Sequence, residues 1–182
     1  MKTRRLGKTN LQVSEIGFGG EWLERHPEEE SIELIRYASS KGINILDCWM
    51  ADPKSRDIIG KGIKENRSQW FIQGHIDSTW KDNQYFRTRD MKYVRPAFED
   101  LLKRLQTDYI DLGMIHYIDS EEEWEQIQHS DYMDYVMELK NTGVIRHIGM
   151  SSHNPKVAVK AAESGFVEMI LFSINPAFDM LP

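Results

Sequence analysis

Short apolar runs alternate along this chain with longer segments of helical periodicity. The runs have strand length, and they occupy residues 13–18, 43–46, 70–72, 109–115, 144–148 and 169–174. Buried strands separated by helices are typical of the parallel sheet of an α/β protein. The pattern therefore predicts an α/β fold with about six strand–helix units.

The segments between the runs carry helix signals. Asp52-Pro53 and Asn154-Pro155 each place an N-cap residue before a proline at the first helical position. Apolar residues recur at helical spacing over about 28–40, over 91–105 and, after the capping residue Ser130, over 131–140. These helices fit between the expected strands.

A polar side chain follows each expected strand. These positions are Glu21, Asp47, His75, His116, Ser151, Ser152, His153 and Asn175. In doubly wound sheets and in (β/α)₈ barrels, ligands bind at the carboxyl ends of the strands. If the sheet curls, these acids, imidazoles and hydroxyls converge on one pocket. Cys48, Trp49 and Met50 would then form an apolar wall beside Asp47.

Composition and charge narrow the class of protein. The chain has 182 residues, 40% of them hydrophobic and 29% charged, with a formal net charge of −6. We expect one domain over residues 1–182, without the basic face that nucleic acid or an anionic membrane requires. The apolar runs are too short to span a bilayer, and MKTRRLGKTN at the start has no apolar signal core. One cysteine, Cys48, fits the cytoplasm and is expected to be a buried hydrophobe.

A doubly wound nucleotide-binding fold is the rival interpretation. It needs a glycine-rich turn that leads directly from the first strand into a helix. Gly17, Gly19 and Gly20 follow the first run, but Trp22 occupies the last glycine position of GxGxxG. The next helix begins several residues later, which disfavours this fold.

Four segments together resemble the aldo-keto reductase family. They are RRLGKTNLQVSEIGFGG (4–20), GINILDC (42–48), LKRLQTDYIDLGMIH (102–116) and GVIRHIGMSSHNP (143–155). The resemblance implies a TIM (β/α)₈ barrel that reduces carbonyls with NADPH. Two short apolar pieces around Thr9-Asn10 predict an N-terminal hairpin, which would resemble the plug at the bottom of that barrel.

Two further segments, QGHIDSTWKDNQY (73–85) and MILFSINPAFDMLP (169–182), resemble a bacterial branch of the family. Complete chains of this branch carry a C-terminal ferredoxin-like [4Fe-4S] segment, whose cysteines this sequence lacks. About eight strand–helix units close a barrel, whereas about six are expected here. We therefore expect a truncated barrel, from an N-terminal fragment of a longer reading frame or a shortened gene product.

The family's catalytic tetrad of Asp, Tyr, Lys and His is only half matched. The resemblance assigns the aspartate to Asp47 and the histidine that orients the substrate oxygen to His116. Asp52 stands in place of the proton-donating tyrosine, and His75 stands in place of the lysine. A carboxyl group is ionised near neutral pH, so Asp52 is better explained as a helix cap.

His75 is the better candidate for proton transfer. Paired with the carboxylate of Asp47, its imidazole could supply an acid near neutral pH, although a hydrogen-bonded core histidine would look the same in sequence. Tyr85 and Lys81, in an expected long loop over 76–89, could reach the pocket and replace the missing phenol. Tyr117 should point to the opposite face of its strand from His116.

The resemblance also implies contacts to NADP(H) or NAD(H). The cofactor-binding candidates are Gly20, Ser151, Ser152 and Asn175. Ser152 replaces the family's asparagine and Leu171 its glutamine, so the carboxamide contacts are only partly kept. Trp22 and Trp49 are expected on the substrate side, with anchoring in the core or of a loop as the alternative.

The expected function is hydride transfer between a nicotinamide cofactor and a small carbonyl or alcohol substrate. One alternative is a catalytically silent barrel that acts in binding or regulation, which the replacements Asp52, His75 and Leu171 favour. The other is a metal-dependent hydrolase or lyase with Asp47, His75 and His116 as ligands, although the chain has no HxH or HExxH spacing. The substrate and the oligomeric state stay open.

Overall fold

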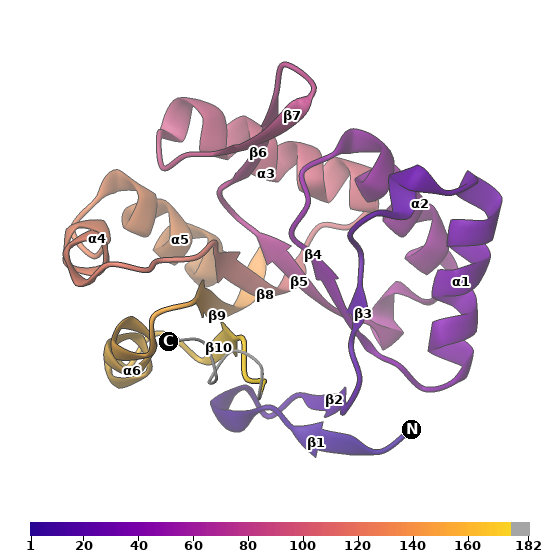
Figure 1. The fold of residues 1–182 in the computed structure, drawn as a ribbon, viewed down its shortest axis with the longest axis horizontal. Coiled ribbons are helices and arrows are strands. Elements are labelled where there is room, and N and C mark those ends of the chain that lie inside the picture. Colours follow the sequence, from indigo (N-terminus) through magenta and orange to yellow (C-terminus); the bar gives the residue numbers. More distant parts are fainter. Residues whose placement is uncertain (176–182) are drawn as a thin grey trace.

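A six-stranded parallel sheet forms the centre of the molecule. The computed structural model describes residues 1–175, and it gives the strand order β10-β9-β8-β5-β4-β3. The strands are β3 (Phe18–Gly19), β4 (Ile45–Cys48), β5 (Phe71–His75), β8 (Ile110–Ile115), β9 (Ile145–Ser152) and β10 (Met169–Phe172). All five pairings are parallel. The sheet is curled into part of a barrel (Figure 1), as the α/β pattern predicted.

Helices cover the outer face of this sheet (Figure 1). They are α1 (Glu28–Ser40), α2 (Pro53–Ile63), α3 (Met91–Leu105), α4 (Glu121–Ile127), α5 (Asp131–Asn141) and α6 (Pro155–Glu163). Side chains such as Ile35, Phe98 and Val136 pack between the helices and the sheet in one large apolar core. Among residues 1–175, no helix is both long and apolar enough to cross a membrane.

A second, smaller apolar cluster lies between the N-terminal hairpin and the sheet. The hairpin pairs β1 (Thr3–Arg5) with β2 (Gln12–Ser14) in antiparallel register. Val13 of β2 packs there with Ile45, Leu112, Met114 and Met169, which come from β4, β8 and β10. The predicted hairpin is confirmed, and its apolar side fills one end of the half-barrel.

The helix boundaries follow the caps that were read from the sequence. The side chains of Asp52, Ser130 and Asn154 accept hydrogen bonds from the backbone N–H groups of Ser55, Met133 and Lys156 respectively. Each cap satisfies an N–H group that has no partner inside its own helix. The predicted starts of α2, α5 and α6 are therefore confirmed.

Two local predictions were wrong. The run 13–18 is not one strand, because the chain turns at Ser14–Gly17 between β2 and β3, and Ser14 Oγ donates to the carbonyl of Ile16 at 2.7 Å. The segment 76–89 is not a plain loop, because β6 (Ser78–Lys81) and β7 (Gln84–Arg87) form an antiparallel hairpin. Asp82 and Asn83 make its two-residue turn with φ of 51° and 60°, a conformation that suits hairpins.

The register of the sheet aligns the strand ends that carry the candidate residues. Asp47 of β4 lies beside Gln73 of β5, and His75 at the end of β5 lies beside Met114 of β8. His116 follows β8 directly, and Ser151 and Ser152 end β9. Four neighbouring strands thus deliver polar side chains to one edge of the sheet.

Candidate active site

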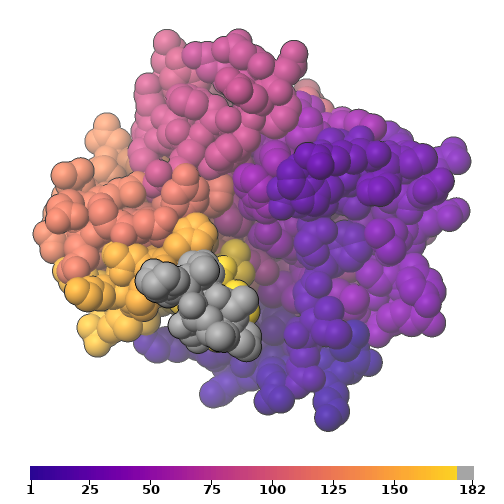
Figure 2. Space-filling model, in the orientation of Figure 1, coloured from indigo at the N-terminus to yellow at the C-terminus, as the bar shows by residue number. Residues whose placement is uncertain are grey.

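A cavity of about 440 Å³ lies at the carboxyl ends of the strands. Its walls come from five strand ends and from the β6–β7 hairpin, which forms the lobe at the top of the molecule in Figure 2. The lining residues are Asp47, Trp49, His75, Tyr85, His116, Tyr117, Ser151, Ser152, His153, Leu171, Phe172 and Ser173. The predicted convergence is therefore present for Asp47, His75, His116 and the Ser151–Ser152–His153 cluster, whereas Glu21 and Asn175 are not among the lining residues.

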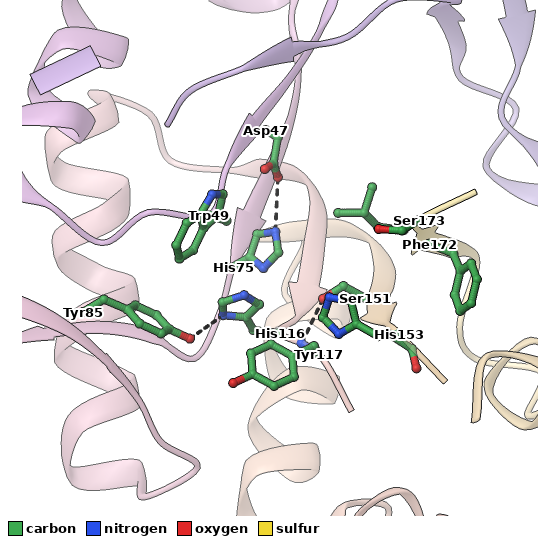
Figure 3. A pocket seen from close by; sticks show the side chains of 12 residues that line it. Asp47, Trp49, His75, Tyr85, His116, Tyr117, Ser151, His153, Phe172 and Ser173 are labelled. Carbon is green, nitrogen blue, oxygen red and sulfur yellow. Dashed lines mark hydrogen bonds and ion pairs between the residues drawn. The ribbon is translucent and has the colours of Figure 1, made fainter. Parts of the chain in front are cut away.

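Asp47 and His75 form a direct pair on neighbouring strands. The Oδ1 atom of Asp47 lies 3.1 Å from Nε2 of His75, whose side chain is 2% exposed (Figure 3). A carboxylate can only accept a hydrogen bond, so His75 carries a proton on Nε2. Its other ring nitrogen, Nδ1, is buried and has no hydrogen-bond partner among residues 1–175. His75 thus lines the cavity with one ring nitrogen that has a carboxylate partner and one that has no partner among the described residues.

His116 lies against the same pair. Its ring meets that of His75 edge to face, with 4.6 Å between the ring centroids. Burial lowers the pKa of His116 far below its usual range, and the nearby guanidinium groups of Arg89 and Arg87 lower it further. His116 is therefore a neutral imidazole at physiological pH, with one nitrogen as donor and the other as acceptor.

Tyr85 reaches the cavity from β7, although the sequence placed it in a loop. Its Oη lies 2.8 Å from Nδ1 of His116, and its ring packs edge to face on Trp49 at 5.4 Å (Figure 3). Burial raises the pKa of the Tyr85 phenol, so the phenol keeps its proton. Lys81, the other candidate from this segment, lies outside the cavity with its ammonium group near the rings of Phe86 and Tyr93.

The two serines at the end of β9 differ in what they can offer a ligand. Ser151 Oγ accepts a hydrogen bond from the N–H of Tyr117 at 2.8 Å, which leaves its own hydroxyl proton for another acceptor. Ser152 Oγ donates to the carbonyl of Ile118 at 2.7 Å and is 2% exposed. Ser151 is thus the one of the pair whose hydroxyl can turn to the cavity.

Other candidates lie away from the cavity lining. Trp22 is 44% exposed, and the guanidinium of Arg25 lies 3.4 Å from its ring centroid. Gly20 packs against β4, where its N–H donates to the carbonyl of Asp47 at 2.9 Å. Asn175 is exposed after the end of β10. Asp52 caps α2 and does not line the cavity.

Several lining residues were missed or misplaced by the sequence reasoning, among them Phe172 and Ser173 at the end of β10. Tyr117 was expected on the opposite face from His116, but β8 ends at Ile115, so strand alternation no longer governs position 117. Its ring lies 5.0 Å from that of His116 and 5.6 Å from that of His153. His153 was noted only as part of a polar cluster, and its ring pairs with Asp119 at 3.0 Å.

Cys48 is buried beside this site and is a poor nucleophile. Burial raises the pKa of its thiol to about 12, so it stays protonated at physiological pH. This agrees with the prediction of a buried hydrophobe.

The cavity side chains are not arranged as a metal centre. No group of three or more histidine, cysteine, aspartate or glutamate side chains within residues 1–175 could hold a metal ion. Nε2 of His75 is turned to Asp47, and Nδ1 of His116 is turned to Tyr85. The arrangement gives no support to the metal-dependent alternative.

A curled parallel sheet with a polar cavity at its carboxyl edge defines a protein of the (β/α)-barrel class. The profile of the aldo/keto reductase family matches residues 15–179, and the chain belongs to this family. The resemblance seen in the sequence is thereby confirmed.

Individual relatives agree with this assignment. The chain is 35% identical over 161 residues to aldo-keto reductase YhdN of Bacillus subtilis, a match that covers 84% of this chain and 47% of YhdN. It is 28% identical to the uncharacterized oxidoreductase YqkF of the same organism, over 100% of this chain and 58% of YqkF. The structure of aldo-keto reductase AKR11C1 from Bacillus halodurans superposes with a TM-score of 0.81 at 29% identity, covering 96% of this chain and 58% of that one. The chain therefore spans about half the length of the curated relatives it matches.

Proposed function

We propose that this protein transfers a hydride between a nicotinamide cofactor and a small carbonyl or alcohol substrate. The observation that carries the proposal is the meeting of Asp47, His75 and His116 in one cavity of an aldo/keto reductase chain. The cavity volume of about 440 Å³ lies within the range of about 300–1,000 Å³ that is usual for small-molecule sites.

The residues at the cavity suit a nicotinamide cofactor, either NADP(H) or NAD(H). The free hydroxyl proton of Ser151 can bond the carboxamide oxygen, whereas Ser152 is occupied by the carbonyl of Ile118. When bound, the nicotinamide supplies or accepts a hydride at the carbonyl carbon. A [4Fe-4S] centre enters the proposal only if the chain continues into a cysteine-bearing segment. We place the protein in the cytoplasm because its one cysteine is a buried thiol.

In this proposal His75 takes over the proton transfer. Asp47 holds the Nε2–H group, so Nδ1, which is buried and has no partner among residues 1–175, is the nitrogen left for the substrate oxygen. In the direction of reduction, His75 starts with both nitrogens protonated and gives the Nδ1 proton to that oxygen; in oxidation it takes the proton back. His116 orients the same oxygen from the neighbouring strand end, and Trp49 and Tyr85 form an aromatic wall for the substrate.

The proposal is tested on the whole 182-residue chain with a panel of simple aldehydes and ketones. We expect carbonyl-dependent oxidation of NADPH or NADH and quenching of Trp49 fluorescence by the cofactor. Asp47→Asn and His75→Gln should each lower turnover by about 10²–10⁴-fold, the usual contribution of a positioned acid or base. His26→Gln, at an exposed position, is the control and should keep the parental rate.

Two results would reject the oxidoreductase proposal. Parental rates in both variants would show that the Asp47–His75 pair does not move the proton. Saturable cofactor binding without turnover of any carbonyl would favour the catalytically silent barrel instead. The resemblance supports this alternative, because Asp52 and His75 stand where the family tetrad has its tyrosine and lysine.

A further inference from the structure

One segment of the chain, residues 77–89, contacts His116 at three different atoms. Asp77 Oδ1 accepts the backbone N–H of His116 at 2.9 Å. Arg89 Nη2 donates to the backbone carbonyl of His116 at 2.7 Å. Tyr85 Oη lies 2.8 Å from the ring nitrogen Nδ1. The backbone of His116 is thus fixed from both sides, and its ring is fixed at one nitrogen.

The segment that holds His116 is itself anchored in the protein core. Asp77 is 0% exposed, forms an ion pair with Arg89 and accepts a hydrogen bond from the hydroxyl of Tyr132 at 3.0 Å. Arg87 donates to the carbonyl of Tyr117 at 2.8 Å and pairs with Glu123. Ion pairs and hydrogen bonds to several elements restrict the geometry of this segment, although the Nε atoms of Arg87 and Arg89 are buried without a hydrogen-bond partner among residues 1–175. Tyr85 therefore approaches His116 from a fixed direction.

The contact between Tyr85 and His116 has only two possible proton arrangements. Either the phenol donates to Nδ1, which leaves the imidazole proton on Nε2, or Nδ1–H donates to the phenol oxygen. Because burial keeps the phenol protonated, its proton needs an acceptor. The structure records Nδ1 of His116 as the only hydrogen-bond partner of Tyr85 Oη among residues 1–175. The first arrangement satisfies the phenol proton, and the second leaves it without a recorded acceptor.

We propose that Tyr85 is a positioning residue that fixes His116 as its Nε2–H tautomer and thereby directs an N–H donor at the substrate's carbonyl oxygen. The role in carbonyl chemistry rests on the function proposed above, whereas the tautomer does not. An oxygen held by His116 Nε2–H beside His75 Nδ1 would receive two hydrogen bonds, and such donors stabilise the negative charge that develops on it. The Tyr85 phenol, on the β6–β7 hairpin, would then influence the substrate oxygen only through His116. The tyrosine of the family tetrad would instead donate a proton to that oxygen directly.

The tautomer can be measured without any cofactor. Long-range nitrogen–proton correlation spectra of the nitrogen-15-labelled chain distinguish a protonated from an unprotonated ring nitrogen in each histidine. We expect His116 to carry its proton on Nε2 in the parent chain. Tyr85→Phe should remove this preference, so that signals of the Nδ1–H form appear. Tyr93→Phe deletes the same hydroxyl from a ring outside the cavity and should leave the His116 spectrum unchanged.

Turnover gives the second readout. We expect kcat of Tyr85→Phe to fall by about tenfold, the effect of losing one oriented hydrogen bond, with KM for the nicotinamide cofactor unchanged. The proposal is overturned by an Nδ1–H tautomer in the parent, by an unchanged tautomer in Tyr85→Phe, or by an unchanged kcat in that variant. A parent chain with the Nε2–H tautomer but no turnover would instead refute the oxidoreductase function and leave the tautomer assignment intact.

Discussion

At the scale of single residues, the cavity shows how the same side chain takes different roles in different surroundings. His75 has a carboxylate on one nitrogen and no partner among residues 1–175 on the other, which suits proton exchange. His116 is buried beside positive groups, which keeps it neutral and suits it to orient a ligand. The cavity therefore brings together two imidazoles with different hydrogen-bond partners and different electrostatic surroundings.

The neutral state of His116 predicts how stability depends on pH. The folded-state pKa of His116 lies far below its ordinary value of 6.5, so below pH 6.5 the unfolded chain binds a proton that the folded chain does not. The free energy of unfolding should therefore fall as pH drops through 6.5, by up to about 1.4 kcal/mol per pH unit from this group. Urea unfolding between pH 7 and 5 should show a shallower loss in His116→Gln than in the parent. Equal slopes in the two proteins would contradict the assignment, and His26→Gln controls for the loss of a histidine.

Sequence reasoning placed Asp47, His75 and His116 correctly at the cavity, but it placed Trp22, Gly20 and Tyr117 less well. Asp47, His75 and His116 each stand where a buried apolar run ends, and parallel strand ends must share one edge of the sheet. Trp22 and Gly20 follow a strand of only two residues, so their directions depend on the turn between β2 and β3. Tyr117 lies past the end of β8, where the alternation used to orient it has stopped.

At the scale of elements, the contact between α2 and α3 depends on one glycine. A Cβ atom built on Gly60 of α2 would lie 2.1 Å from the carbonyl oxygen of Arg104 in α3. Real Cβ atoms do not approach a carbonyl so closely, so the two helices pack at this distance only because position 60 has no side chain. α2 also follows the loop that carries Trp49, one of the cavity-lining residues.

Gly60→Ala should therefore destabilise the protein even though alanine favours helices. The gain in helix propensity is about 1 kcal/mol, whereas forcing backbone apart in a packed core costs about 1–3 kcal/mol or more. We expect a net loss in the free energy of unfolding, measured by urea denaturation. Gly19→Ala is the matched control, since nothing lies within 4 Å of its Cβ position. A Gly60→Ala variant as stable as Gly19→Ala would disprove the close packing of the two helices.

The elements that could be predicted from sequence are those fixed by local chemistry. Caps such as Asp52 and Asn154 determine where their helices begin through bonds to residues two or three positions away. The β6–β7 hairpin was missed because its strands are only four residues long and largely polar, and their stability comes from contacts with distant residues. Ser78 Oγ donates to the carbonyl of Trp49, and Arg87 donates to the carbonyl of Tyr117.

At the scale of the whole molecule, the sheet of the described chain is open. β3 pairs only with β4, and β10 pairs only with β9, so among residues 1–175 the sheet has two edges. Leu171 and Ile174, at and just after β10, are 40% and 86% exposed. The barrel class could be predicted from the family resemblance, but the curl of this sheet and the extent to which it closes depend on packing across the whole sheet and cannot be read from local patterns.

The open sheet predicts an uneven protection of its amides. The central strands β5 and β8 each pair with a strand on both edges. Their amides should therefore exchange hydrogen only on global unfolding. We expect the amides of β10 and β3 to exchange at least about tenfold faster, because they open locally at an edge. Hydrogen–deuterium exchange of the 182-residue chain, followed by mass spectrometry of peptides, measures this directly. Equal protection across all six strands would mean that both edges are covered in solution.

The close approach of Gly20 to β4 has a consequence for anyone searching this chain for functional positions. A methyl group at position 20 would meet the carbonyl oxygen of Asp47 at 2.7 Å and Ile59 at 2.8 Å, so the acid's own peptide would have to shift. A mutational screen scored only by lost turnover would then rank Gly20 beside Asp47. Gly20 would then be scored as a catalytic position, although the structure shows only that a side chain there would collide with the backbone of β4.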